Sequence, residues 1–161
     1  IVVSRGPFYM YGDWEFYLKQ DPTEANREVV MEKGLHAVLA LLKHKRDVIF
    51  VLDPPKLGVN PEKCYKRPFI SASPCVNDAQ EYFALHKTYR EIASRVVSEY
   101  SNVQIFDPAD LLCDNVLCYG VINGKVLYGD PGHINVAGAT LISHVLAPIL
   151  LEKVSAGVSE L

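Results

Sequence analysis

Two short apolar runs constrain the fold of this chain more than any other feature of its sequence. Residues 48–52 read Val-Ile-Phe-Val-Leu, and residues 103–106 read Val-Gln-Ile-Phe. Runs of this length are typical of strands buried inside a parallel sheet. Each run is followed by Asp-Pro, at residues 53–54 and 107–108, and proline cannot continue the hydrogen-bond ladder of a strand. The pattern therefore predicts two buried strands of one sheet.

Stretches with helical periodicity alternate with these strands. Residues 26–44 and residues 77–100 each repeat apolar side chains at helical spacing. The predicted buried stripes are Met31, Leu35, Val38, Leu39 and Leu42 in the first stretch, and Tyr82, Leu85, Tyr89, Ile92, Val96 and Tyr100 in the second. Residues 113–128 are typical of a small hairpin around the Asn123-Gly124 turn. Because strands and helices alternate, we expect an α/β fold with a parallel sheet covered on both faces.

The two ends of the chain lead to separate expectations. Residue 1 is Ile, and residues 1–4 open the chain with a strand-like apolar run, so we expect the sequence to be a piece of a longer product. Asn135 is placed to cap a final helix, which we expect to kink or end at Pro148. The tail, residues 153–161, is expected to be frayed.

The four cysteines, Cys64, Cys75, Cys113 and Cys118, allow three pairings. Each close pair lies in a loop-like context rich in Pro, Asn and Asp. Disulfides Cys64–Cys75 and Cys113–Cys118 are the favoured interpretation, and they suit an oxidising compartment such as the bacterial periplasm. Each would remove loop entropy worth about 2–3 kcal/mol. Two alternatives stay open: four reduced thiols in a cytosolic protein, or a zinc site, although neither pair has Cys-x-x-Cys spacing.

Composition and charge exclude several functions. The chain has 161 residues, of which 49% are hydrophobic and 22% charged, and its formal net charge is −3. These values fit one globular domain and argue against intrinsic disorder. No basic block is longer than residues 43–46, so we do not expect a nucleic-acid partner. The longest apolar stretches, such as residues 145–151, are far shorter than the roughly 20 residues needed to cross a bilayer.

The strongest candidate for chemistry is the pair Asp130 and His133, three residues apart. One turn of backbone places both side chains on the same side, so the carboxylate can hold the imidazole in one tautomer and stabilise its protonated form. The other ring nitrogen is then able to deprotonate a serine. Pro131 stiffens this turn and Gly132 permits it. The competing interpretation is a surface turn with a capping Asp and a solvated His, because Asp-x-x-His is common by chance.

We expect this pair at the sheet edge where parallel strands end, because ligands bind there in open α/β sheets. Residues 5–6, 53–54 and 107–108 leave strands at that edge, and the 130–133 loop is expected to lie along it. The other histidines lie in helical stretches and show no metal-ligand spacing: His36, His44, His86 and His144. We therefore expect neither a metal nor any other cofactor.

Several blocks of the sequence resemble a known family. Residues 130–139, Asp-Pro-Gly-His-Ile-Asn-Val-Ala-Gly-Ala, are similar to the final block of SGNH hydrolases, in which an Asp and a His three residues apart precede a helix of small residues. Residues 106–119, 124–130 and 58–64 resemble, more specifically, the SGNH domain attached to acyltransferase-3 membrane proteins. The likeness extends over about residues 1–151.

The resemblance implies the SGNH hydrolase fold, a three-layer sandwich around a parallel, flavodoxin-like sheet that is incomplete at the N-terminus. Residues 1–152 would form the C-terminal portion of a single domain. It also implies a serine-dependent O-acyltransferase that acetylates a bacterial surface glycan, such as the O-antigen of lipopolysaccharide. The implied partners are an acyl donor, a glycan acceptor and a membrane acyltransferase domain upstream in the same polypeptide. This domain would then lie in the periplasm, attached to the inner membrane.

By the same resemblance, His133 would be the general base and Asp130 its orienting partner. The serine of the family lies in a Gly-Asp-Ser block, which is absent from this sequence, so we expect the serine upstream of Ile1. Arg5 or the Gly6 amide is a candidate for binding an oxyanion or the substrate. Two alternatives assign the chain differently: a carbohydrate O-acetyl esterase, or a degenerate module that binds a glycan or a partner without catalysis.

Overall fold

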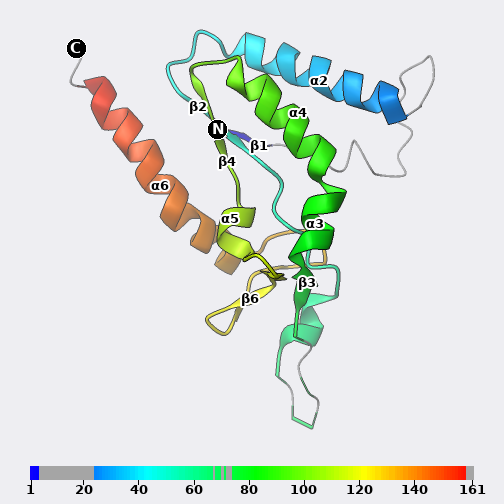
Figure 1. Ribbon diagram of the computed structural model, residues 1–161. Helices are drawn as coiled ribbons and strands as arrows, with labels where there is room; N and C mark the ends of the chain where they lie inside the picture. Colours follow the sequence, from blue (N-terminus) through cyan, green and yellow to red (C-terminus); the bar gives the residue numbers. More distant parts are fainter. Residues whose placement is uncertain (4–23, 67, 70, 72–73, 159–161) are drawn as a thin grey trace. The chain divides into compact units, whose positions relative to one another are not determined.

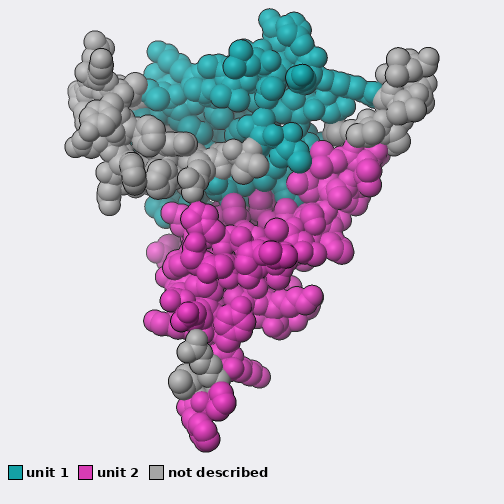
Figure 2. Space-filling view, turned by 180° about the vertical axis from the view of Figure 1, so that it is seen from behind, with its two compact units in different colours: residues 1–53, 83–107 teal, residues 54–82, 108–161 magenta. Residues whose placement is uncertain are grey.

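The chain forms an α/β fold that divides into two compact units (Figure 2). The computed structural model describes residues 1–3, 24–66, 68–69, 71 and 74–158. Unit 1 consists of residues 1–53 and 83–107, and unit 2 of residues 54–82 and 108–161. Two of the crossings between the units fall inside the Asp-Pro dipeptides that follow the apolar runs. Each of these dipeptides therefore follows a strand and marks a crossing from unit 1 to unit 2.

Unit 1 is built on a parallel sheet of three strands (Figure 1). The strands are β1 (Val2–Val3), β2 (Val48–Val51) and β4 (Val103–Phe106), in the order β1-β2-β4. The pairing of β2 with β4 begins with Val48 opposite Val103. All the side chains of β2 are buried, as expected for a strand covered on both faces. Both strands predicted from the apolar runs are thus confirmed.

The helices α2 (Glu24–Leu41) and α4 (Lys87–Ser98) share one core with this sheet. The buried members of the core are Leu35, Leu39, Phe50, Leu52, Tyr89, Ile92, Ala93, Val96 and Val97. Full burial of a large apolar side chain contributes about 1.5–3 kcal/mol. The predicted stripe of α2 is wrong at Val38, which is 43% exposed. Leu35 and Leu39 lie four residues apart on the buried face of α2. Val38 is on a different side of the helix and is therefore turned toward solvent.

The predicted helix over residues 77–100 is instead a strand followed by two helices. β3 (Val76–Asp78) precedes α3 (Ala79–Leu85), and α4 begins after His86. The backbone of His86, with φ −97° and ψ 6°, interrupts the helix and changes the phase of its repeat. Leu85, predicted in the buried stripe, is therefore 57% exposed, whereas His86 is buried.

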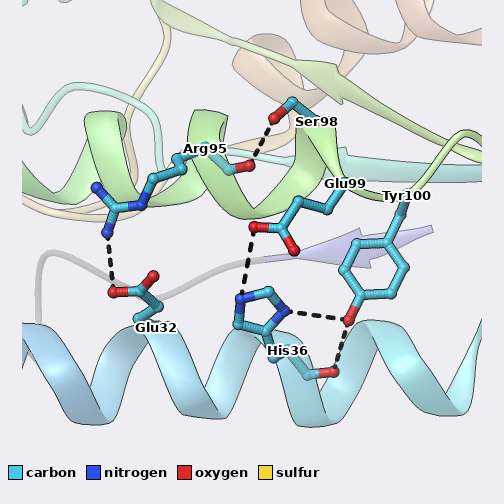
Figure 3. Close-up of polar contacts among 6 residues, drawn as sticks. All are labelled: Glu32, His36, Arg95, Ser98, Glu99 and Tyr100. Atoms are coloured by element: carbon cyan, nitrogen blue, oxygen red, sulfur yellow. Dashed lines mark hydrogen bonds and ion pairs between the residues drawn. The ribbon is translucent and has the colours of Figure 1, made fainter.

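Polar side chains join α2 to α4 and to the residues that follow it (Figure 3). Arg95 donates to Glu32 at 2.8 Å. The Tyr100 hydroxyl donates to the carbonyl of His36 at 3.2 Å, and Nδ1 of His36 lies 3.2 Å from the same oxygen. Glu99 lies 3.9 Å from Nε2 of His36. Exposed ion pairs contribute only about 0.2–1 kcal/mol each, so the apolar core is the larger stabilising term here.

Unit 2 contains short strands in place of a layered sheet. β3 pairs antiparallel with β5 (Leu117–Tyr119), and β6 (Val121–Ile122) pairs antiparallel with β7 (Lys125–Val126). Asn123 and Gly124, in the turn between β6 and β7, have φ values of 52° and 73°, as a tight two-residue hairpin requires. The predicted hairpin is confirmed at residues 121–126, whereas residues 113–119 of the predicted range belong to a disulfide-closed loop and to β5. The sequence pattern did not predict the pairing of β3 with β5.

Three described helical elements lie wholly in unit 2: η1 (Pro61–Cys64), α5 (Ala109–Leu112) and α6 (Val136–Val158). Helix α6 passes through Pro148, where we expected a kink or an end, and continues beyond residue 153. A proline removes one backbone hydrogen bond, but its fixed φ is helical, so a helix can continue through it. Among the described residues, no helix is both long and apolar enough to span a membrane.

Two disulfides join separate segments of unit 2. Cys64 is bonded to Cys75 and Cys113 to Cys118, with S–S distances of 2.02 and 2.03 Å. The first lies in the core of the unit, whose buried members are Leu57, Cys64, Cys75, Leu112, Val126, Leu127 and Tyr128. The second closes the loop between α5 and β5. These are the two pairings favoured from the sequence.

Candidate active site

Asp130 and His133 are in contact on one loop of unit 2. The Nδ1 atom of His133 lies 2.8 Å from Oδ2 of Asp130 and 2.9 Å from Oδ1. These are the distances of a charge-assisted hydrogen bond. When Nδ1 carries the proton, Nε2 is the ring nitrogen that can accept another. The geometry is therefore that of a base with its orienting carboxylate.

The backbone of the same loop holds the carboxylate in place. Oδ1 of Asp130 accepts the N–H groups of Gly132 and His133, each at 2.8 Å. An Asp bonded to the backbone two residues later forms an Asx turn. The hydrogen bond from the Gly132 N–H, followed by the one from the His133 ring, lowers the pKa of Asp130 below its ordinary value. The carboxylate is therefore ionised at neutral pH, as it must be to stabilise an imidazolium.

The two ends of the loop are joined like a strand pair. The N–H of Gly129 donates to the carbonyl of His133 at 2.9 Å. Next to this bond, Tyr128 and Ile134 form an isolated antiparallel bridge. The residues between these contacts are therefore closed into a short loop, and His133 is one of the residues that close it.

Asn135 connects this loop to helix α6. Its side-chain oxygen accepts the N–H groups of Ala137 and Gly138, at 2.8 and 3.1 Å, which makes it the predicted N-cap. Its amide nitrogen donates to the carbonyls of Val126 and Tyr128, at 2.9 and 3.1 Å. One side chain thus holds the start of α6 against the strand that leads into the loop.

A second segment of unit 2 supports the loop from another side. The carbonyl of Pro131 accepts the N–H groups of Leu57 and Gly58, at 2.9 and 3.3 Å. The hydroxyl of the buried Tyr128 donates to the carbonyl of Pro55 at 2.5 Å. Burial of this phenol, and then the nearby Tyr82, raise its pKa, so it stays a donor. The part of the chain before η1 had no recognisable periodicity, and its role here could not be predicted.

Gly132 does not have the role predicted for it. Its φ is not in the left-handed region, and a Cβ built there would come no closer than 3.8 Å to the Asp130 Oδ1 atom. Gly138, at the start of α6, has no room for a side chain: a Cβ would lie 2.4 Å from the carbonyl oxygen of Leu127 and 2.6 Å from Cγ2 of Ile134. Glycine is therefore required where α6 closely approaches Leu127, and not in the turn at residues 130–133.

Both side chains of the pair are open to solvent. His133 is 66% exposed and Asp130 53%. A substrate can therefore reach the imidazole, and the chemistry that the pair supports is proton transfer. In the part of the chain that the structure describes, no three His, Cys, Asp or Glu side chains are grouped to hold a metal ion.

Other predicted site features are not brought together with the pair. Arg5 and Gly6 lie outside the described residues, so their oxyanion or substrate role stays a prediction. The parallel strands belong to unit 1 and the 130–133 loop to unit 2. The expected position of the loop along the strand-end edge therefore stays a prediction as well.

The strand-end edge of unit 1 carries an ion pair that the sequence analysis missed. Arg90, on α4, donates to Asp107, which directly follows β4. The Asp107 side chain is 8% exposed, and the Arg90 guanidinium lies 4.9 Å from the centre of the Phe83 ring. The pair joins the helix to the end of the strand. Residues so far apart in the chain follow neither a helical nor a strand period, so no pattern signalled the contact.

An α/β fold with an Asp–His pair on the loop before a helix is typical of serine-hydrolase-like proteins. The family model described as SGNH domain (fused to AT3 domains) matches residues 1–148, and the chain belongs to this family. Membership supports an activity of the esterase or acyltransferase type and a membrane acyltransferase domain in the same polypeptide. Searches of curated proteins and of solved structures found no match.

Proposed function

We propose that this chain is the acyl-transferring module of a membrane O-acyltransferase that acetylates a bacterial surface glycan, such as the O-antigen of lipopolysaccharide. The observation that carries the proposal is the contact of His133 Nδ1 with the Asp130 carboxylate at 2.8 Å. The family, whose SGNH domains are fused to AT3 domains, supports it. In this proposal His133 is the general base and Asp130 holds it in the correct tautomer.

The reaction needs a serine, which we place outside these 161 residues because the sequence has no Gly-Asp-Ser block. His133 Nε2 takes the proton of the serine hydroxyl while the serine oxygen attacks the acyl carbonyl of the donor. The donor's leaving group then takes that proton, and the acyl group remains on the serine. In the second half, His133 deprotonates a glycan hydroxyl, which attacks the acyl-serine, and the proton returns to the serine oxygen. Asp130 stays ionised throughout and stabilises the imidazolium.

The surroundings follow from the same proposal. Together with the segment that this proposal places the serine on, the domain would be a three-layer sandwich with a flavodoxin-like sheet, and the 130–133 loop would lie at its strand-end edge. Arg5 or the Gly6 amide would bind the oxyanion or the substrate. The domain would lie in the periplasm, attached to the inner membrane, where the two disulfides are stable.

The test uses the whole polypeptide, with its membrane domain, in cells that display the glycan. We expect His133→Ala and Asp130→Asn to reduce glycan acetylation by a factor on the order of 10⁴ or more, because each removes a member of a catalytic unit. His144→Ala is the matched control, since His144 is an exposed histidine on α6. Retained acetylation in His133→Ala would refute the assignment. Unfolding of that variant would make His133 a structural residue.

The exposure of the pair supports hydrolysis as a second candidate. Water that reaches His133 can take the place of the glycan hydroxyl, and the product is then free acetate. Comparison of acetate release with glycan acetylation, in the same preparation, separates an O-acetyl esterase from a transferase. If neither product depends on His133, a module that binds without catalysis is the better account.

A further inference from the structure

The loop closed by the Cys64–Cys75 disulfide has a buried base and an exposed end. Cys64 and Cys75 are 8% and 2% exposed and belong to the core of unit 2. Between them, Tyr65 is 52% exposed and Phe69 is fully exposed. The disulfide therefore joins the two ends of this loop. The structure thus holds two aromatic side chains out in solvent on a covalently closed loop.

The backbone of Phe69 adds to this observation. Its φ is 66°, in the left-handed region that a bulky residue rarely adopts. A glycine or an asparagine would adopt this conformation more readily. Phenylalanine at such a position, with no burial in return, has no benefit for the stability of the fold. We therefore look for its benefit in a contact outside the chain.

Positive charge accompanies the two aromatic residues. Lys63 and Lys66 are both exposed. In the sequence, residues 65–74 contain two basic residues and no acidic one, although Glu62 precedes them. Lys63 lies beside the loop, in η1, and Lys66 lies on it. We name Tyr65, Lys66 and Phe69 the basic aromatic tip. Aromatic rings together with lysines are typical of protein surfaces that lie at the headgroup level of a bilayer.

We propose that the basic aromatic tip contacts the surface of an anionic phospholipid bilayer. The membrane's presence rests on the proposed function, because fusion to a membrane acyltransferase domain would keep this chain beside a bilayer. Charge complementarity then selects the occupant, since lysines near an anionic leaflet are attracted to it. A glycan is a less suitable occupant, because ligand sites are concave and Phe69 projects into solvent.

The contact is weak by itself and strengthened by attachment. Each lysine near an anionic surface raises the affinity about fivefold, and two aromatic rings add a further modest gain. A tether to the membrane domain supplies a high effective concentration, so weak affinity is enough to keep the tip at the surface. The consequence is orientation: the tip would set which face of unit 2 is turned to the bilayer.

Fluorescence quenching tests the contact directly. Phe69→Trp is mixed with vesicles of brominated phosphatidylglycerol and phosphatidylcholine in equal parts, and the signal of the native Trp14 is subtracted with the unsubstituted chain. Val116→Trp is the matched control, because Val116 is a 64% exposed apolar residue on the other disulfide-closed loop. Circular dichroism and thiol titration verify that each variant is folded with both disulfides formed. We expect quenching and a blue shift for Phe69→Trp only.

Charge variants sharpen the result. Lys66→Gln should lower the vesicle affinity of Phe69→Trp about fivefold, and added salt should lower it further. Lys63→Gln should have a smaller effect, because Lys63 lies in η1 and outside the loop. Equal quenching at positions 69 and 116, or none at position 69 in a folded variant, overturns the proposal. If Phe69→Ser instead weakens glycan binding while vesicles have no effect, the tip is a glycan site. Failure of the proposed function is seen separately, in the His133→Ala assay, which does not use the tip.

Discussion

The two units of this chain are stabilised in different ways. Among the residues that the structure describes, unit 1 has one parallel sheet, the helices α2 and α4, and a core of nine buried side chains. Unit 2 has two pairs of short strands, two disulfides and many single hydrogen bonds from loops. In unit 1 the apolar pattern repeats along each element, so many residues favour the same fold. In unit 2 each contact depends on one particular residue or backbone group, and no repeating pattern supports it.

The candidate active site lies in the second kind of structure. The Asp130–His133 loop is held by the carbonyl of Pro131, the side chain of Asn135 and its own Asx turn. None of these supports is part of a layered core. Loops positioned by a scaffold often carry function because their residues are not needed to fill the interior. Variants that destabilise one unit or the other therefore test whether unit 1 depends on its layered core and unit 2 on disulfides and single hydrogen bonds.

The largest effect is expected in the core of unit 1. Phe50→Ala removes a ring that is 1% exposed, and should lower the free energy of unfolding by about 3–5 kcal/mol. Denaturant unfolding measures the loss, and hydrogen exchange should show it first in β2 and α4. Leu41→Ala is the matched control, because Leu41 is 81% exposed in the same unit and should change stability by less than about 0.5 kcal/mol. Equal effects of the two variants would contradict the assigned core.

The next effect belongs to unit 2. Replacing Cys64 and Cys75 together by Ala opens a link across 11 residues and should cost about 3 kcal/mol in the chain-entropy model. The Cys113 and Cys118 double variant opens a link across 5 residues and should cost about 2 kcal/mol. Hydrogen exchange should show the loss in β3 and β5 before α4. Early loss in α4 would mean that the two units are not stabilised separately.

The same contrast explains what could be predicted from the sequence. The strands at 48–52 and 103–106 were found because buried strands need runs of apolar residues, and Asn123-Gly124 was found because the turn needs positive φ. The Asp130–His133 contact was predictable because both partners lie within one turn of backbone. The support of that loop by Leu57 and Gly58 could not be predicted, because every residue type except proline has a backbone N–H, so the sequence does not indicate which one donates.

Substitutions of two glycines near the site test whether the loop depends on close packing of α6 or on a flexible turn. Gly138→Ala places a Cβ 2.4 Å from the Leu127 carbonyl and should lower stability by about 1–3 kcal/mol, as overpacking does. Gly132→Ala meets no atom closer than 3.8 Å and should be nearly neutral. Thermal unfolding of the pair measures both. If Gly132→Ala were the more damaging variant, the turn and not the approach of α6 would hold the loop.

The smallest effect is the response of the site loop to acid. Because the Gly132 N–H and the His133 ring lower the pKa of Asp130 in the folded chain, its carboxylate adds stability above its unfolded pKa. That stability is lost as the pH falls through the lower, folded pKa. The pKa of Asp114 is also lowered, chiefly by the hydrogen bond from the Tyr119 hydroxyl, so the two carboxylates have to be observed separately.

NMR separates these two carboxylates, because the amides of Gly132 and His133 report on Asp130 and those of Val116 and Leu117 on Asp114. We expect the first pair of amides to shift with a midpoint below 3.8, the ordinary value for Asp. In Asp130→Asn that transition should vanish, while the amides that report on Asp114 keep theirs. A midpoint at or above 3.8 would mean that the Asx turn does not hold the carboxylate in solution. The exposed pair would then be an ordinary surface contact, unlike the ion pair of Arg90 with Asp107 in unit 1, whose carboxylate is largely buried.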